Sequence, residues 1–270
     1  MRNLVIAMFF MGMQQLNAET IMGFSDKGSL NQNQIEIEYD QNINALEMDK
    51  WMRHLSKKPH HVGSIAGKEN AEYIAKLFES WGFDVEIEEY HVLIPTPMTR
   101  ELSLISPTIY QASLTEESLA EDPSTFVREN LLPPYNAFSI DGNVEGELVF
   151  VNYGMPQDYE ILDRYGIDVK GKIAIAKYGK SWRGIKPKLA GEKGAIATII
   201  YSDPADDGYG MGDVYPKGPF KNDSAVQRGS VMDMPTYPGD VLTPGIGATK
   251  TAKRLRFEDA TTITKIPVLP

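Results

Sequence analysis

One glycine-bounded loop carries residues suited to binding an anion. Residues 178–184 have the sequence Tyr-Gly-Lys-Ser-Trp-Arg-Gly and follow an apolar run that predicts a strand. The loop is therefore expected at the carboxyl edge of a sheet, where α/β proteins gather their binding sites. The guanidinium of Arg183 would offer a carboxylate a planar, permanently charged fork there. The alternative is a surface ion pair with one of the chain's 37 acidic residues, which the sequence alone favours.

Other polar clusters are weaker candidates for a site. His60 and His61 are adjacent, but neighbouring side chains in an extended segment point to opposite sides, which favours structural histidines over a metal site. Four aspartates lack the alternate-position spacing of a calcium loop and are expected in a solvated turn: Asp203, Asp206, Asp207 and Asp213. The glycine-rich residues 208–212 lack the following helix and the Lys/Ser pair of a nucleotide-binding loop.

The elements that would position these residues alternate between strands and helices. Apolar runs predict strands at residues 101–105, 147–151, 172–176 and 195–201, with helices at 158–165 and 187–193. This spacing implies crossover connections and a mixed α/β fold. Upstream, the patterns predict helices at 44–56 and from about residue 64 to Gly82, and then a half-buried strand at 83–93. Pro95 and Pro97 mark a domain boundary.

The N-terminus has the order of a secretory signal. Arg2 precedes an apolar run from Leu4 to Met13, and a small residue follows at Ala18. This order predicts a signal peptide over residues 1–18 and export to the periplasm or the exterior, with a buried N-terminal helix as the alternative. The run is about half as long as a membrane-spanning helix, so no stable membrane anchor is expected. Residues 19–42 are polar and are expected to form a flexible lead-in.

Composition narrows the class of protein. Of 270 residues, 42% are hydrophobic and 24% are charged, which is typical of globular chains. The 27 Lys and Arg against 37 Asp and Glu give a net charge of −10, so nucleic acid is not an expected partner. Because the sequence has no cysteine, disulfides, thiolate zinc sites and a cysteine nucleophile are excluded.

Five short segments occur in an order that resembles a known family. They are PHHVGS at 59–64, KYGKSWRG at 177–184, IYSDP at 200–204, VQRGS at 226–230 and LTPG at 242–245. Together they resemble the glutamate carboxypeptidase (N-acetylated-alpha-linked acidic dipeptidase, transferrin-receptor-like) family of zinc exopeptidases, over about residues 20–270. The resemblance implies that residues 43–95 begin an α/β peptidase domain. Residues 96–270 would form an inserted protease-associated (PA) or apical domain, incomplete at its C-terminal end, in a chain truncated before the catalytic core.

The resemblance also implies roles for individual residues. Arg183 matches the inserted-domain arginine that contacts the terminal carboxylate of the substrate, and Ser230 stands where those enzymes have an asparagine that contacts the same group. Thr243 and Ile246 match positions that contribute oxygens to a structural calcium. The ligands of the family's two zinc ions and its general base would lie after residue 270, so this chain alone is expected to be inactive.

Three functions fit these observations. The leading one is the N-terminal portion of an exported zinc-dependent exopeptidase that acts on a peptide substrate, with the intact protein a homodimer, as the resemblance implies. The second is a non-catalytic, transferrin-receptor-like binding protein. The third is a PA domain that binds peptides by itself. Zinc ligands in a downstream segment would distinguish the first function from the second.

Overall fold

The computed structural model describes residues 20–129, 131–233 and 239–270. The chain divides into two units, residues 1–57 and residues 58–270. The signal peptide predicted over residues 1–18 lies outside the described residues. Within the described ranges, no helix combines the length and the apolar character that a membrane span requires.

The described residues of the first unit, 20–57, form two helices, α1 (Asp26–Asn42) and α2 (Ala45–Leu55). The sequence predicted no regular structure in residues 19–42, and α1 corrects that expectation. Ser25 caps α1 by accepting a hydrogen bond from the Gly28 amide. Glutamines donate to glutamates one turn later along the helix, at 2.9 Å from Gln32 to Glu36 and 2.8 Å in a second pair. A helix without an apolar stripe leaves no hydrophobic periodicity in the sequence, which explains the error.

The two other helices predicted before residue 83 are confirmed. The Asn44 side chain caps α2, accepting from the amides of Leu46 and Glu47. In the second unit, α3 spans Ile65–Ser80 and begins after Ser64, whose hydroxyl oxygen accepts from the Gly67 amide. Gly82 follows α3 with a φ of +88°, a left-handed conformation that glycine adopts without steric cost at a helix end.

The strand predicted at residues 83–93 is wrong, because the structure contains no strand in this segment. Phe83 and Ile87 are more than half exposed, at 59% and 55%. The segment is held instead by single hydrogen bonds, such as His91 N to Ala248 O at 2.7 Å. A strand needs a neighbour that bonds alternate backbone groups, and alternation of apolar and polar residues does not provide one. The strand predicted at 101–105 is reduced to β1 (Ser103–Leu104), paired antiparallel with β2 (Tyr110–Gln111).

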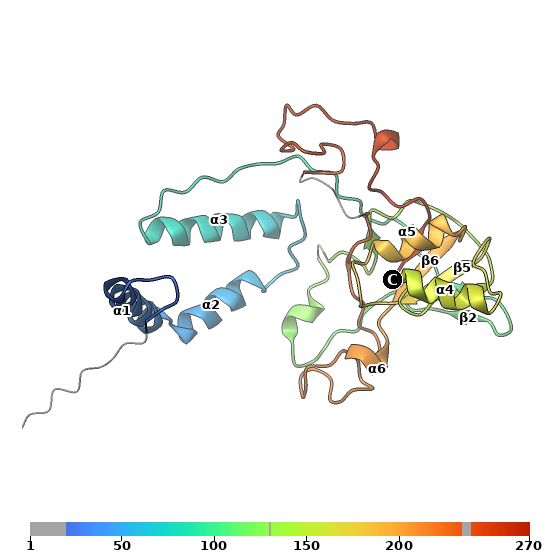
Figure 1. The fold of residues 1–270 in the computed structure, drawn as a ribbon, viewed down its shortest axis with the longest axis horizontal. Helices are drawn as coiled ribbons and strands as arrows, with labels where there is room; N and C mark the ends of the chain where they lie inside the picture. The colour runs from blue at the N-terminus through green and yellow to red at the C-terminus, as the bar shows by residue number, and fades with distance from the viewer. Residues whose placement is uncertain (1–19, 130, 234–238) are drawn as a thin grey trace, which may run out of the picture. The chain divides into compact units, whose positions relative to one another are not determined.

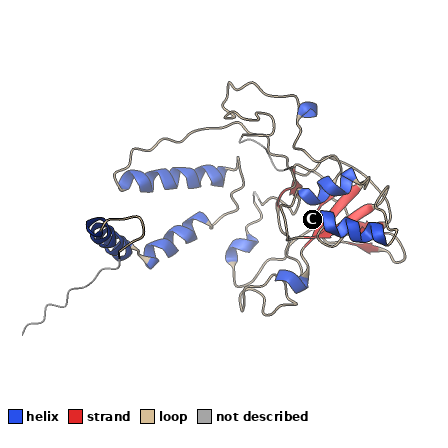
Figure 2. Ribbon diagram, in the orientation of Figure 1, coloured by secondary structure: helices blue, strands red, loops and turns tan. Residues whose placement is uncertain are grey.

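A four-stranded parallel sheet forms the centre of the second unit (Figures 1 and 2). Its order is β4 (Leu148–Phe150), β5 (Ile173–Lys177), β6 (Ala197–Tyr201) and β8 (Val268–Leu269). Helix α4 (Pro156–Arg164) connects β4 to β5, and α5 (Ile185–Glu192) connects β5 to β6. Parallel neighbours require such crossovers. The α/β class, the three central strands and both connecting helices are confirmed.

The sheet and its helices share one buried apolar cluster. Ala174 and Ala176 of β5 are fully buried, together with Tyr159 of α4 and Ala190 of α5. Small side chains on the strand let both helices approach the sheet closely. The burial stabilises the layer in proportion to the apolar area that is removed from water. The result is a rigid support for the loops that follow the strands.

Short elements outside the sheet connect distant parts of the chain. Strand β3 (Asn136–Ala137) pairs in parallel with β7 (Gly229–Ser230). Helix α6 (Pro204–Asp207) is a single turn after β6, and two short 3-10 helices span Pro123–Phe126 and Phe257–Asp259. The β3–β7 pair brings residues 131–137 beside residues 226–231, and this contact shapes both sites described below.

Candidate functional site

The loop after β5 is shaped by two residues in left-handed conformation and fixed by a buried lysine. Gly179 and Lys180 have φ values of +97° and +65°. Lys186, only 1% exposed, donates from Nζ to the carbonyl oxygens of Gly179 at 2.9 Å and Tyr153 at 2.5 Å. Burial lowers the pKa of Lys186 to about 8. Lys186 therefore ties the loop to the turn that follows β4.

Arg183 is half-buried between two aromatic rings. Its guanidinium carbon lies 5.7 Å from the ring centroid of Tyr178 and 5.4 Å from that of Trp182, within the range of cation–π attraction. Its Nη1 donates to the carbonyl oxygen of Ser230 at 3.0 Å. A Cβ at Gly229 would overlap the guanidinium, so glycine at this position makes the room that Arg183 occupies.

The charge of Arg183 is not neutralised by the described part of the chain. No ion pair among these residues includes Arg183, so the structure does not support the alternative of a surface ion pair. Its Nε is buried without a hydrogen-bond partner. An orphaned buried donor is costly unless a ligand or water satisfies it. The guanidinium is thus prepositioned and still has donors to offer.

The structure brings Ser230 beside Arg183. The contact to Arg183 runs through the Ser230 backbone carbonyl. The Ser230 hydroxyl oxygen accepts from the Met232 amide at 3.2 Å, which leaves its proton free to donate. Trp182 Nε1 donates to the Met232 carbonyl at 2.9 Å and fastens the loop to the same segment. Whether Arg183 and Ser230 bind substrate stays a prediction.

A cleft of about 440 Å³ opens beside this loop at the carboxyl ends of β4, β5 and β6. Its walls come from the residues that follow these strands and from the segment before β7: Tyr153, Tyr178, Gly179, Lys180, Asp203, Ala205, Asp206, Asp207 and Gln227. Tyr178 belongs to this wall, and its ring also lies within cation–π range of the Arg183 guanidinium. The cleft occupies the edge of the sheet where the sequence analysis placed the site.

The aspartates of the cleft are paired rather than free. Lys177 Nζ lies 2.9 Å from Asp203 and 3.3 Å from Asp206, and the Tyr153 hydroxyl donates to Asp206 at 2.7 Å. The hydrogen bond from Lys177 lowers the pKa of Asp203, and the same bond raises the pKa of Lys177. Asp207 pairs with Lys221. Asp206 and Asp207 are exposed, as expected of a solvated turn, and these pairs add to that expectation.

The remaining metal candidates do not assemble a complete site. Thr243 and Ile246 share one turn, in which the Ile246 amide donates to the Thr243 carbonyl at 3.2 Å. Thr243 is buried and its hydroxyl has no partner among the described residues, but calcium takes about six to eight oxygens. The nearby Asp240 carboxylate already accepts from the amides of Leu93 and Leu242.

The described ranges contain no cluster of three or more His, Asp or Glu side chains, which a zinc site would require. His60 and His61 each place Nδ1 against a nearby carbonyl oxygen, at 2.9 Å to Lys58 and 2.8 Å to Val62. They therefore serve the turn before α3, as the sequence analysis favoured. No chemical step can be assigned to a metal from these residues.

Lys186 and Gly229 matter to the site and were missed by the sequence analysis. Lys186 lies in a segment, Ile-Lys-Pro-Lys, whose composition suggests an exposed helix start. Its burial follows from the approach of two separate turns, which no local pattern records. Gly229 occurs in VQRGS, one of the segments noted above. A glycine between two polar residues is the only feature of the sequence that indicates a close approach of another group to the backbone there.

Comparison with known proteins agrees with the sequence resemblance. The PA domain family matches residues 144–251. A probable glutamate carboxypeptidase of Arthroderma benhamiae is 37% identical over 211 residues, 74% of this chain and 28% of the relative. A glutamate carboxypeptidase 2 homolog of Caenorhabditis elegans is 32% identical over 247 residues, 85% of this chain and 31% of the relative.

Two further matches come from a curated protein and a solved structure. Vacuolar protein sorting-associated protein 70 of Saccharomyces cerevisiae is 31% identical over 211 residues, 75% of this chain and 26% of the relative. An aminopeptidase from Aneurinibacillus sp. strain AM-1 has a TM-score of 0.38 and 22% identity, covering 71% of this chain and 35% of that one. The chain thus spans less than a third of the length of the three curated relatives named here.

Proposed function

Because the chain belongs to the glutamate carboxypeptidase family and carries a PA domain, we propose that it supplies the substrate-contacting module of a zinc-dependent exopeptidase. The observation that carries this proposal is the state of Arg183. Its guanidinium is held by one carbonyl and two rings, lies opposite no protein carboxylate in the described ranges, and retains a buried donor without a partner.

Arg183 would bind the terminal carboxylate of a peptide substrate through charge-assisted N–H···O bonds. Such a bond contributes about 1.5–3 kcal/mol, or roughly ten- to hundredfold in affinity. The Ser230 hydroxyl would donate to the same carboxylate, with the smaller contribution of a neutral donor. The loop is held in place by Lys186 and Trp182 before substrate arrives, so little ordering cost would oppose binding.

Zinc, when bound in an enzyme of this kind, supplies an activated water for hydrolysis. In our proposal its ligands lie outside the described residues, and this chain contributes substrate positioning. The calcium contacts of Thr243 and Ile246, export of the protein and a homodimeric intact form are further parts of the same proposal. Export rests on the order of the N-terminal residues, the other two rest on the family resemblance, and each stays a prediction.

Calorimetric titration of the purified chain tests the carboxylate contact. The ligands are N-acetyl-alanyl-alanine, whose only charge is the terminal carboxylate, and its C-terminal amide. We expect the acid to bind more tightly than the amide, and Arg183→Ala to lose about ten- to hundredfold in affinity for the acid alone. Arg183→Lys should recover only part of that loss, because a lysine keeps the charge without the fork.

Arg164→Ala is the matched control, since Arg164 is an exposed arginine at the end of α4 and lines neither cavity. Its affinity for both ligands should equal that of the wild type. Equal binding of the acid and the amide by the wild type would contradict the proposal. An equal loss for both ligands in Arg183→Ala, together with a lower melting temperature, would instead make Arg183 a structural residue.

A further inference from the structure

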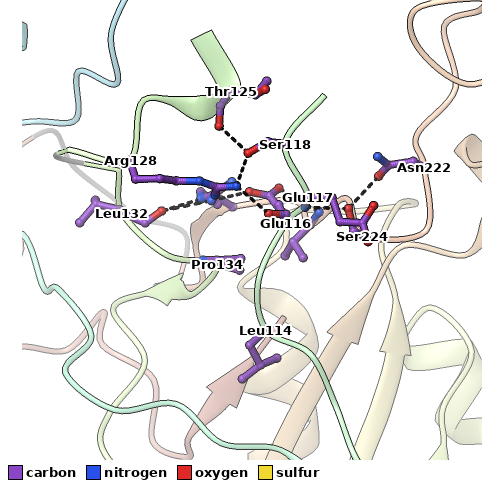
Figure 3. Close-up of polar contacts among 12 residues, drawn as sticks. Leu114, Glu116, Glu117, Ser118, Thr125, Arg128, Leu132, Pro134, Asn222 and Ser224 are labelled. Carbon is purple, nitrogen blue, oxygen red and sulfur yellow. Dashed lines mark hydrogen bonds and ion pairs between the residues drawn. The ribbon is translucent and has the colours of Figure 1, made fainter. Parts of the chain in front are cut away.

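A second cavity in the same unit concentrates arginines. It has a volume of about 200 Å³ and its lining comes from four parts of the chain: Arg100, Leu114, Thr115, Glu116, Arg128, Leu131, Pro133, Pro134 and Arg228. None of these residues lines the cleft beside Arg183. Figure 3 shows part of its polar network, with Arg128 directed toward Glu116 and Ser118. No role for this cavity follows from the five sequence segments that resemble the family or from the proposed function.

Each of the three arginines donates to at least one backbone carbonyl. Arg100 Nη1 donates to the carbonyl oxygens of Leu114 at 3.1 Å and Pro134 at 2.6 Å. Arg228 donates from Nε and Nη2 to the Leu132 carbonyl at 3.2 and 3.1 Å. Carbonyl groups orient a guanidinium but leave its net charge in place. The pKa of Arg100 is lowered by burial and, to a smaller extent, by the positive charge of Arg228.

Within the described residues, Glu116 is the only carboxylate that forms an ion pair with any of these three arginines. Glu116 Oε2 lies 2.5 Å from Arg228 Nη2, and its Oε1 accepts from the Val226 amide at 3.2 Å. Arg128 donates to the Ser118 hydroxyl oxygen and the Glu116 carbonyl, and no described ion pair includes Arg128 or Arg100. Three positive charges and one negative charge leave the lining with a formal excess of two positive charges.

We propose that this cavity binds the carboxylate of a small organic anion, between Arg128 and Arg100. Guanidinium groups with unused donors match a carboxylate in shape and charge. Leu131, Pro133 and Pro134 give the cavity an apolar wall, which suits the hydrocarbon part of an organic acid and not a fully hydrated inorganic ion. Two sources present such a carboxylate, a free short-chain acid and an acidic side chain of a peptide, and the titration below distinguishes them. The proposal is independent of the role given to Arg183.

Calorimetric titration of the purified chain with four probes tests the site. Isovalerate is a free carboxylate with a branched apolar group, and isovaleramide is its neutral counterpart. N-acetyl-glutamate α-amide presents a carboxylate only on its side chain, as an acidic peptide would. Inorganic phosphate tests for an anion without an apolar part. We expect saturable binding of at least one of the two organic carboxylates, and no binding of isovaleramide.

Three variants locate the binding. Arg128 is exposed and pairs with no carboxylate in the described ranges, so Arg128→Gln should fold normally and weaken carboxylate binding about tenfold or more. Arg164→Gln removes the same charge outside the cavity and should bind like the wild type. Glu116→Gln keeps the shape of the side chain but removes the internal anion, so binding should tighten by about three- to tenfold.

The outcomes separate the sources and the alternatives. Binding of isovalerate alone identifies a free acid, binding of the glutamate amide alone identifies a peptide side chain, and either supports the site. The site is refuted if neither carboxylate binds, if the acid and isovaleramide bind equally, or if Arg128→Gln and Arg164→Gln behave alike. Binding of phosphate without either carboxylate also overturns the assignment. If Glu116→Gln does not bind the carboxylate more tightly than the wild type, Glu116 and the ligand do not compete for these arginines. That outcome also refutes the site.

Discussion

Arg183 and the three arginines of the second cavity differ in what surrounds their charge. Arg183 rests between two aromatic rings, bonded to one carbonyl, with no carboxylate of the described chain paired to it. The second cavity contains its own partial counter-ion, Glu116, bonded to Arg228. A ligand of Arg183 would meet a single prepositioned cation, whereas a ligand of the cavity would compete with an internal carboxylate. We therefore expect ligand affinity to depend on a single residue more strongly at the Arg183 site than in the second cavity.

The segment around β7 connects the two arginine sites. Arg228 points into the cavity lining, Gly229 makes room for Arg183, and the Ser230 carbonyl accepts from Arg183. The pairing of β7 with β3 fixes this segment beside Asn136 and Ala137. Neighbouring residues of one short strand thus serve separate sites, and substitutions in the loop after β5 should disturb the first site more than the second.

Gly184→Ala should have the largest effect on stability. A Cβ at Gly184 would overlap the backbone carbonyl of Met232, which cannot move as a flexible side chain does. Overpacking of this kind costs about 1–3 kcal/mol. Urea unfolding should therefore show a clear loss in the free energy of unfolding, together with weaker binding at Arg183.

Gly191→Ala is the control for that change. A Cβ at Gly191, inside α5, would make ordinary contact with Ile266 at 3.6 Å. Alanine favours the helix over glycine by about 0.5–1 kcal/mol, so this variant should match or exceed the wild type. A Gly184→Ala chain as stable as Gly191→Ala would show that the loop is not packed against Met232 as described.

Lys186 should make the stability of the fold depend on pH. Its pKa falls from 10.5 to about 8 on folding, so the unfolded chain binds more protons between these values. Stability should therefore rise with pH from about 8 to 10.5, by at most about 1.4 kcal/mol per pH unit. The comparison is urea unfolding of the wild type and Lys186→Met across this range. If the free energy of unfolding changed with pH equally in the two proteins, Lys186 would not have a pKa lowered by burial.

Ser230→Ala should have the smallest effect. The substitution keeps the carbonyl that holds Arg183 and removes only a hydroxyl, whose neutral hydrogen bond is worth about 0.5–1.5 kcal/mol. Titration with N-acetyl-alanyl-alanine should show a loss well below that of Arg183→Ala. Stability should stay near the wild-type value, because the hydroxyl oxygen accepts one half-buried amide. A loss as large as that of Arg183→Ala would contradict the ranking of the two residues.

Strands β5 and β6 could be predicted because they are largely buried and parallel. Such strands are continuous apolar runs, as in residues 195–201, and their signal is local. The segment at 83–93 has the alternation of a strand but no partner in the described structure, and pairing is not a local property. The polar helix α1 shows the opposite case, in which caps and side-chain pairs form a helix that hydrophobic periodicity does not reveal.

The position of Arg183 could be predicted, but its environment could not. A glycine-bounded loop after an apolar strand indicates the edge of the sheet. The contacts that define the site come from Gly229, Ser230 and Met232, more than 40 residues away, and depend on the pairing of two strands of two residues each. Strands this short have almost no sequence signature. The arginines of the second cavity are likewise brought together only by tertiary structure.

Titration of N-acetyl-alanyl-alanine and isovalerate into Arg183→Ala and Arg128→Gln tests most directly that Arg183 recognises a terminal carboxylate. If Arg183 recognises the carboxylate, Arg183→Ala should lose about ten- to hundredfold in affinity for the dipeptide and retain the carboxylate site of the second cavity. Arg128→Gln should show the reverse pattern. Carboxylate recognition by Arg183 is ruled out if Arg183→Ala binds the dipeptide as tightly as the wild type, or if its loss of affinity is the same for the acid and the amide.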